Sequence, residues 1–350
     1  MARADFTKST KESLARRVQY KCAFPGCNAI TIGPSDETPE ATSNSGMACH
    51  IVAASGGPGA RRVDPTMSAE SRESIDNGIW MCYMHGKLID TDEVTYTVPM
   101  LKRWRELAEL RAKLSQQLGQ SIDLTTAVTE PLPLAESEVI LRTLGDENEK
   151  IGQALLNSCI SEVWGKDLAA AVRDIAIEVV RNAFSHGAAS SFRIAIDTNK
   201  VKITDNGNPF LYSSLVNNPN GRGGAAAIKE LQSYANNVLL SSRRSETENE
   251  TMIALIKQPD EVVALTPCAV EFEARNLHEE GFSIPVLSGC DFTYIVMPIF
   301  ISFSDAFKLI ELLQERALSG ERFVIVTRQA SAGVIRELSA GIPSSQVMVL

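Results

Sequence analysis

A chain of 350 residues is too long for one ordinary hydrophobic core, so two or three domains are expected. Hydrophobic residues make up 44% and charged residues 22%, as in globular proteins, and no apolar run approaches the roughly eighteen residues of a membrane-spanning helix. The net charge of −9 does not exclude nucleic acid, because the first 115 residues are nearly balanced, with 15 Lys and Arg against 14 Asp and Glu.

The cysteines and the start of the chain favour a cytoplasmic protein. The first residues lack the apolar stretch of a secretory signal, and the seven cysteines are odd in number and irregularly spaced. Such cysteines are typical of a reducing compartment rather than of a disulfide framework. Cys268, Cys290 and His278 lack the spacing of metal ligands, and we expect them to be packing or surface residues.

Residues 1–115 are expected to form a first module that has little core of its own. A helix is predicted over residues 1–21, and residues 28–79 are rich in Gly, Pro, Ser, Thr and Asn. Apolar residues at helical spacing predict a second helix over 99–119. Residues 116–135 are polar and contain prolines, which favours a linker. A bound metal could supply the stability that the loop-rich stretch lacks.

Two pairs of candidate metal ligands flank this loop-rich stretch. Four residues separate Cys22 from Cys27, and two separate Cys82 from His85. Zinc takes four nitrogen or sulfur donors in a tetrahedron, often as two close pairs. The spacing predicts a structural Zn²⁺ site; the alternative is buried cysteines beside an incidental histidine.

Between the two pairs lies an ordered set of short motifs. It resembles the HNH nucleases of ββα-metal fold, and most of all the HNH effector domains of bacterial antiphage systems that destroy DNA when a cyclic nucleotide is sensed. The resemblance covers about residues 15–112 and is carried by IGPSDE, His50-Ile51, a Gly-Gly-Pro turn, DPTMSAESR, Asn77-Gly78-Ile79-Trp80 and Lys87-Leu88-Ile89-Asp90.

The resemblance implies a role for several residues. His50 would be the general base that activates water against a phosphodiester, Asn77 would orient the loop and the base, and Mg²⁺ or Mn²⁺ would stabilise the phosphate. The chain departs from the family at Cys49, where an acidic residue or His usually precedes the base, and at Gly86, where a metal-binding His is usual. Asp90 could replace that ligand.

Two further alternatives follow from these departures. His85 could be catalytic with Cys49 binding zinc instead, or the fold could bind DNA without cutting it. Basic pairs such as Arg16-Arg17 and Arg61-Arg62 fit either a path for double-stranded DNA or solvated faces.

Residues 136–258 alternate between helix and strand patterns. A helix followed by antiparallel strands favours an α/β sandwich rather than a parallel sheet. The predicted elements are a helix over 167–186, strands over 192–197 and 200–205, a helix over 224–236, and strands over 237–242 and 251–258.

Three motifs in this region suggest nucleotide binding. Glu178 and Asn182 are four residues apart on one helix face, so the carboxylate could polarise a water while the amide holds Mg²⁺. Asp205 and Gly207 end a strand, where the Asp could accept from an adenine amino group. A glycine-rich stretch precedes a helix whose N-terminus favours phosphate, with glycines at Gly221, Gly223 and Gly224.

Each motif alone has an ordinary structural explanation: a helix residue, a hairpin turn and a flexible loop. In this order they resemble the N, G1 and G2 boxes of the GHKL ATPases, which include histidine-kinase catalytic domains and gyrase. The resemblance covers about residues 136–258 and implies an ATP-binding α/β sandwich in which Glu178 activates water.

Residues 262–350 carry strand-like runs and two helices, over 304–318 and 331–339, and predict a small α/β domain. Ser304 is expected to cap the first of these helices. The fold class is thus α+β with several domains. We expect a nucleotide-gated DNA endonuclease, plausible as an antiphage effector, cytoplasmic and homo-oligomeric. The alternative is a regulatory GHKL ATPase or kinase that uses a degenerate HNH fold only to bind DNA or protein.

Overall fold

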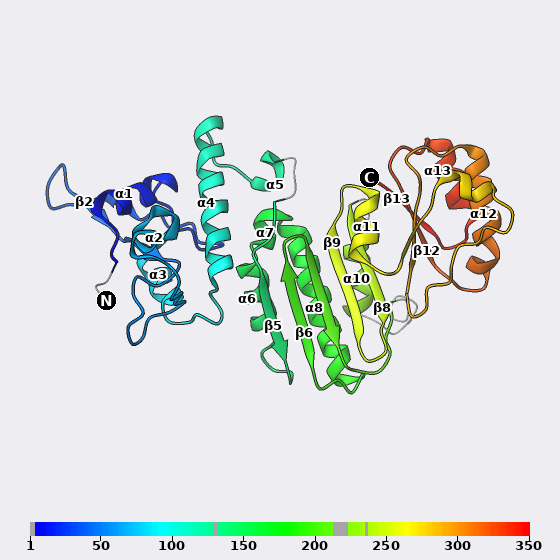
Figure 1. Ribbon diagram of the computed structural model, residues 1–350, viewed down its shortest axis with the longest axis horizontal. Helices are drawn as coiled ribbons and strands as arrows, with labels where there is room; N and C mark the ends of the chain where they lie inside the picture. The colour runs from blue at the N-terminus through cyan, green and yellow to red at the C-terminus, as the bar shows by residue number, and fades with distance from the viewer. Residues whose placement is uncertain (1–3, 129–131, 213–222, 235–236) are drawn as a thin grey trace. The chain divides into compact units, whose positions relative to one another are not determined.

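The computed structural model describes residues 4–128, 132–212, 223–234 and 237–350 (Figure 1). The chain divides into two compact units, Met1–Ser137 with Gln153–Gly165, and Glu138–Gly152 with Lys166–Leu350. Helices and several separate sheets agree with the α+β multidomain class. Within the described ranges, no helix is both long and apolar enough to cross a membrane.

The first unit is built from short elements around one hairpin. Strand β3 (Gly46–His50) pairs antiparallel with β4 (Gly78–Cys82), so that His50 lies opposite Gly78, and helix α3 (Tyr83–Ile89) follows directly. The unit's other elements are α1 (Lys8–Arg17), β1 (Ile32–Pro34), β2 (Thr42–Asn44), α2 (Ala69–Glu73), η1 (Ile75–Asn77), α4 (Val98–Leu118), α5 (Leu124–Ala127) and α7 (Ile160–Val163).

Local capping explains where its two longer helices begin and end. The predicted helix over 99–119 is confirmed as α4, which Thr97 caps at its start and Gly119, with a φ of 68°, ends. The helix expected over 1–21 is shorter than expected, because Thr7 caps α1 and Gln19 and Tyr20 adopt φ values of 54° and 56°.

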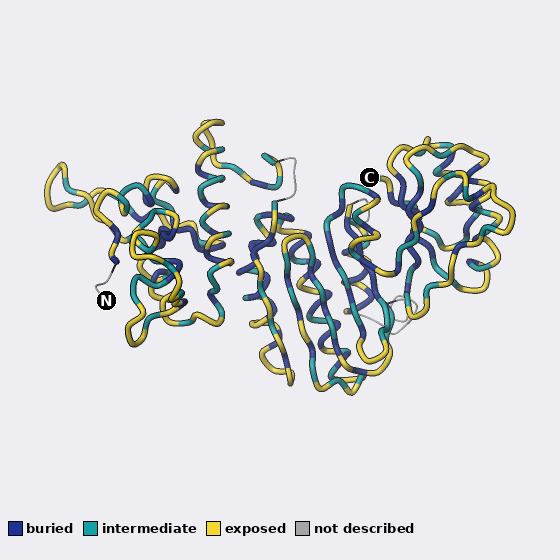
Figure 2. The backbone as a smooth tube through the Cα atoms, in the orientation of Figure 1, coloured by how far each residue is buried: buried dark blue, intermediate teal, exposed yellow. Residues whose placement is uncertain are grey.

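The stretch expected as a linker, 116–135, carries more structure than its composition indicates. It contains α5, and Leu124 and Leu134 are buried. Figure 2 colours the backbone by burial and shows buried positions in both units. The amide of Ala135 donates to the carbonyl of Ser158 at 2.9 Å. These contacts tie the stretch to the first unit.

The second unit contains a five-stranded sheet in the order β5-β6-β7-β9-β8. The predicted strands 192–197 and 200–205 are confirmed to the residue, and the register places Asp205 opposite Asn249. Helices α8 and α10 pack side by side and contact strands of this sheet (Figure 1). The elements are β5 (Ser137–Leu141), α8 (Lys166–Ser185), β6 (Phe192–Asp197), β7 (Lys200–Asp205), α10 (Gly223–Gln232), β8 (Val238–Arg244) and β9 (Asn249–Leu255). Helix α6 (Glu147–Asn157) begins in this unit and ends in the first.

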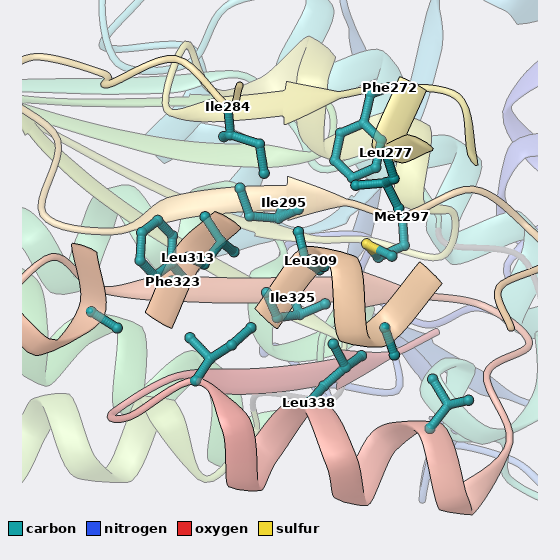
Figure 3. Packing of buried hydrophobic residues seen from close by; sticks show 14 residues of the cluster. Phe272, Leu277, Ile284, Ile295, Met297, Leu309, Leu313, Phe323, Ile325 and Leu338 are labelled. Atoms are coloured by element: carbon teal, nitrogen blue, oxygen red, sulfur yellow. The ribbon is translucent and has the colours of Figure 1, made fainter. Parts of the chain in front are cut away.

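The end of the chain adds a four-stranded parallel sheet in sequential order. One apolar cluster joins strands β11 and β12 to helices α12 and α13, with Leu309, Leu313, Phe323 and Leu338 at its centre (Figure 3). The elements are α11 (Pro259–Leu265), β10 (Ala269–Glu271), η2 (Ala274–His278), β11 (Thr293–Val296), α12 (Phe303–Leu318), β12 (Phe323–Thr327), α13 (Ala332–Gly341) and β13 (Gln346–Val349).

A second apolar cluster joins this parallel sheet to the antiparallel one. It contains Leu239 and Ala254 of the five-stranded sheet together with Val296 and Val324 of the four-stranded sheet. Residues 262–350 therefore share buried surface with the five-stranded sheet.

Two expectations about residues 262–350 are wrong. Cys268 and Cys290 form a disulfide, because the loops before β10 and β11 bring their Cα atoms to 5.7 Å although 22 residues separate them. The cap of α12 is Ser302 rather than Ser304, since the Ser302 hydroxyl accepts from the amide of Asp305. His278 is exposed, as expected, and it pairs with Asp305 at 2.7 Å.

Candidate functional site

Four side chains of the first unit meet at the junction of β4 and α3. The ligand atoms of Cys22, Cys27, Cys82 and His85 all lie within 4.8 Å of one another and could hold a metal ion. Nδ1 of His85 lies 3.1 Å from the Cys82 sulfur and 3.5 Å from the Cys22 sulfur.

The backbone brings the two ligand pairs together. The amide of Cys22 donates to Ala29 and that of Cys27 to Phe24, which closes a tight knuckle, and the amide of Ala23 donates to Trp80 of β4 at 3.0 Å. On the other side Cys82 is the residue before the first turn of α3, so His85 follows it within that turn.

The surroundings of the cluster are apolar. The His85 ring stacks on Phe24 with centroids 3.9 Å apart, and Phe24 meets the edge of Trp104 at 5.0 Å. Burial raises the pKa of the Cys22 thiol to about 12 and lowers the pKa of His85. A cation at this point would favour the thiolate and the neutral imidazole, which are the metal-binding forms.

His50 lies at the end of β3, close to the first described residues of the chain. Its ring stacks on Phe6 at 3.8 Å, and Nε2 lies 3.0 Å from the carbonyl of Ala4. Because a carbonyl only accepts, Nε2 is the donor, and in the neutral ring Nδ1 is then the nitrogen that can take up a proton.

Asn77 is almost fully buried and holds the loop after His50. Its Oδ1 accepts from the amide of Val52 and its Nδ2 donates to the carbonyl of Val52, both at 2.8 Å. Nδ2 also donates to the carbonyl of Arg72. These contacts fit the orienting role that the resemblance implies for Asn77.

Arg62 was grouped with the exposed basic residues in the sequence, but its side chain is only 4% exposed. It donates to the carbonyls of Ile51, Ile89 and His50, and pairs with Asp90 at 3.3 Å. Burial lowers the pKa of Arg62, while the charge of Asp90 opposes that shift. Arg62 thus connects the end of β3 to the end of α3 through hydrogen bonds, and it forms an ion pair with Asp90.

The two departures from the HNH pattern lie against each other. A Cβ at Gly86 would lie 2.5 Å from the sulfur of Met47 and 2.8 Å from that of Cys49, so a larger residue has no room there. Burial raises the pKa of the Cys49 thiol well above its usual range. Cys49 is therefore a packing partner of α3 and does not belong to the metal cluster, so the alternative that gave it to zinc is not supported.

His50, Cys49 and Asp90 line one cavity of about 340 Å³, together with Arg61 and the loop 57–59. Among the described residues, the one group of three or more close His, Cys, Asp or Glu ligand atoms is the cluster at Cys22. Asp90 is the carboxylate among the residues that line the cavity at His50, and Arg62 pairs with it.

In the second unit, two of the three nucleotide motifs meet in a cavity between α8 and α10. Its volume is about 970 Å³, and Glu178, Arg181, Gly223 and Asn148 are among the residues that line it. Gly223 lies so close to Glu178 that a Cβ there would be 2.7 Å from its carboxylate. Arg181 is held in turn by Glu147.

The third motif lies at the end of β7, outside the residues that line that cavity. Asp205 is buried, and its Oδ1 accepts from the amide of Gly207 at 2.9 Å and from Nδ2 of Asn249 at 2.8 Å. Burial raises the pKa of Asp205, and these two bonds and the charge of Arg244 oppose the rise.

The backbone joins this motif to α8. The amide of Asn208 donates to the carbonyl of Gly187, which follows α8, and the amide of Gly187 donates to the carbonyl of Asn182. Asn182 is half-buried, Gly224 is buried in α10, and Gly221 lies outside the described residues.

Sequence reasoning missed three residues that the fold brings to these sites. Arg62 carries no signal that separates it from Arg61, and Asn249 and Arg244 follow no motif. The common signal of Asn249 and Arg244 is a polar residue at the end of a strand pattern, which is too general to single them out.

Comparisons with protein-family models, curated proteins and solved structures found no match to the chain. The resemblances to HNH nucleases and GHKL ATPases therefore rest on the motifs themselves.

Proposed function

We propose that the chain is a nucleotide-gated DNA endonuclease with its cutting site at His50. One observation carries the proposal, the arrangement of the β3-β4 hairpin and helix α3. His50 lies at the end of β3, and Asn77 holds the loop that follows it. The cluster of Cys22, Cys27, Cys82 and His85, which could hold a metal ion, lies at the start of α3. An antiphage role follows only from the family resemblance.

The cluster of Cys22, Cys27, Cys82 and His85 suits a structural Zn²⁺. Three sulfurs and one imidazole nitrogen are the donor set that zinc prefers in closed, four-coordinate sites. The ion would hold the knuckle to the β4-α3 junction and so stiffen the hairpin that carries His50.

The proposed chemistry at His50 is hydrolysis of a phosphodiester. Nδ1 of His50 takes a proton from a water molecule, the water oxygen bonds to phosphorus, and the bond from phosphorus to the leaving oxygen breaks. The leaving oxygen is protonated by solvent. Arg61, which is exposed at the mouth of the same cavity, would attract the DNA phosphate.

Asp90 and the DNA phosphate would hold a Mg²⁺ or Mn²⁺ ion beside His50, and the ion would stabilise the charge on the phosphate. Comparing DNA cleavage in EDTA with cleavage in Mg²⁺ or Mn²⁺ tests whether the reaction needs this ion.

ATP is the proposed gating ligand. The cavity between α8 and α10 combines Glu178 with the N-terminal glycine of α10, as a site for phosphates and an activated water would need. ATP would have to favour one conformation or homo-oligomer by about 1–3 kcal/mol to control the nuclease. Asp205→Asn should abolish ATP binding, whereas Glu178→Ala should bind ATP without hydrolysing it.

The experiment is cleavage of supercoiled plasmid by purified protein, with and without ATP, in EDTA, Mg²⁺ or Mn²⁺. We expect cleavage by the wild type and by the control His186→Ala, whose histidine lies beyond α8, and none by His50→Ala. Equal cleavage by His50→Ala would remove His50 from the mechanism.

A second candidate is a regulatory ATPase or kinase whose first unit binds DNA or protein without cutting it. Two observations favour it. Gly86, where the family usually has a metal-binding His, has no room for a larger side chain, and Asp90, which could replace that ligand, is paired with Arg62. Plasmid binding without cleavage under every condition would support this candidate.

A further inference from the structure

Asn249, the first residue of β9, has all its amide groups engaged around the loop that follows β7. Its Nδ2 donates to Oδ1 of Asp205 at 2.8 Å and to the carbonyl of Asn208 at 2.9 Å. Its Oδ1 accepts from the amide of Phe210 at 3.0 Å and from Nη1 of Arg244 at 3.1 Å. One buried side chain thus connects Asp205 to the middle and to the end of the loop 206–210.

Arg244 fixes the orientation of that amide. It ends β8 directly opposite Asn249, and its Nη1 also donates to the carbonyl of Gly207 at 2.8 Å. With Arg244 and the amide of Phe210 both donating to it, the oxygen of Asn249 must face them. If the Asn249 amide were flipped, its NH₂ group would face two other donors, Arg244 and the amide of Phe210. Asn249 can therefore present only its NH₂ donor to Asp205.

Gly289 holds the backbone of Arg244. The amide of Arg244 donates to the carbonyl of Gly289 at 2.8 Å, and Gly289 has a φ of 78° and no room for a Cβ beside Arg244. The neighbouring Arg243 points elsewhere, because its side chain pairs with Glu250.

Both bonds to Asp205, from Asn249 and from Gly207, engage Oδ1. A carboxylate held in this way presents Oδ2 as an acceptor in a fixed direction. An adenine offers a 6-amino donor to such an oxygen, whereas hypoxanthine offers a 6-oxo acceptor, which the carboxylate repels.

We propose that Arg244 and Asn249 are positioning residues that make Asp205 select a 6-amino purine over a 6-oxo purine. The inference rests on the proposed nucleotide binding and assigns its base specificity to residues outside the three motifs.

The test compares ATP with inosine triphosphate by calorimetry in Mg²⁺, using the full chain. The two nucleotides carry the same phosphates, so a change in their affinity ratio reports on the base alone. We expect the wild type to prefer ATP. In Asn249→Ala and Arg244→Ala this preference should fall about tenfold, the effect expected for loss of a hydrogen bond to a charged group. Arg243→Ala is the matched control and should keep the wild-type ratio.

Each other outcome is decisive. If both variants bind the two nucleotides more weakly by the same factor, the residues only stabilise the fold and the inference fails. An unchanged ratio in Arg244→Ala, whose partly exposed side chain can be removed without opening the core, also overturns it. A wild type that binds neither nucleotide overturns the proposed ATP site itself, which separates that failure from the failure of the inference.

Discussion

The Asn77 side chain makes two hydrogen bonds to the backbone of Val52, both at 2.8 Å. Its Nδ2 donates to the Val52 carbonyl, and its Oδ1 accepts from the Val52 amide. Val52 is two residues beyond His50, and the amide of the intervening Ile51 donates to the carbonyl of Asn77. The backbone after His50 is therefore held at two successive residues by one partner.

Asn77→Ala should destabilise the first unit by about 1–3 kcal/mol, because it leaves buried backbone groups of Val52 without partners. All three tryptophans, Trp80, Trp104 and Trp164, lie in this unit, so denaturant unfolding followed by tryptophan fluorescence measures it selectively. The exposed Asn28→Ala is the control. An unchanged midpoint for Asn77→Ala would contradict the prediction.

Cys22→Ser should lose the metal and unfold the first unit, since the loop-rich segment has little apolar surface of its own. Elemental analysis should find about one zinc per wild-type chain and almost none in the variant. Cys159→Ser, which changes a buried cysteine outside the cluster, should keep its zinc. Wild-type protein purified without chelators and free of zinc would refute the site.

Arg62→Met should destabilise the first unit by about 3 kcal/mol or more, because several buried carbonyls lose their donor at once. Asp90→Asn should lower the stability of the first unit by only about 0–1 kcal/mol. The Asp90 side chain is 48% exposed, so solvent screens its charge in the pair with Arg62. Fluorescence-detected unfolding of the two variants tests this asymmetry. Similar losses in both would mean that the ion pair, and not the carbonyl bonds, dominates.

Reduction of the Cys268–Cys290 disulfide should destabilise the second unit by about 3 kcal/mol, the value expected for a loop of this length. Hydrogen exchange in β11 and β12, with and without dithiothreitol, measures the effect where it arises. Cys290→Ala should behave like reduced wild type and be insensitive to dithiothreitol. Equal protection in both redox states would show that the bond contributes nothing.

Asp305→Asn should reduce stability at pH 7 by an amount that disappears in acid. Burial pushes the pKa of Asp305 upward, but hydrogen bonds from the Ser302 amide, from His278 and from the Ser302 hydroxyl outweigh it and hold the pKa below its usual value. The carboxylate therefore stabilises the fold above its unfolded pKa of about 3.9, and this contribution is lost as the pH falls through the lower folded value.

Thermal unfolding of the wild type and Asp305→Asn from pH 7 downward tests this pattern. Asp260→Asn, at the start of α11, is a suitable control. A difference between Asp305→Asn and the wild type that stays constant down to the lowest pH would contradict the assigned role.

The amino-acid sequence by itself determined the local features of this protein. Strands 192–197 and 200–205 and helix α4, which has Pro99 in its first turn, follow from side-chain periodicity and capping, which act over a few residues. The pairing of Cys22 and Cys27 with Cys82 and His85 could also be predicted, since ligand spacing is itself a local pattern.

Only the tertiary structure decided which distant residues meet. Arg62 and Arg61 are indistinguishable in sequence, yet one is buried under backbone carbonyls and the other lies at the surface. The bond between Cys268 and Cys290 and the contact of Asn249 with Asp205 depend likewise on how strands pair and sheets pack. Periodicity says which face of an element is buried, but the partner across that face is chosen by the packing of the whole core.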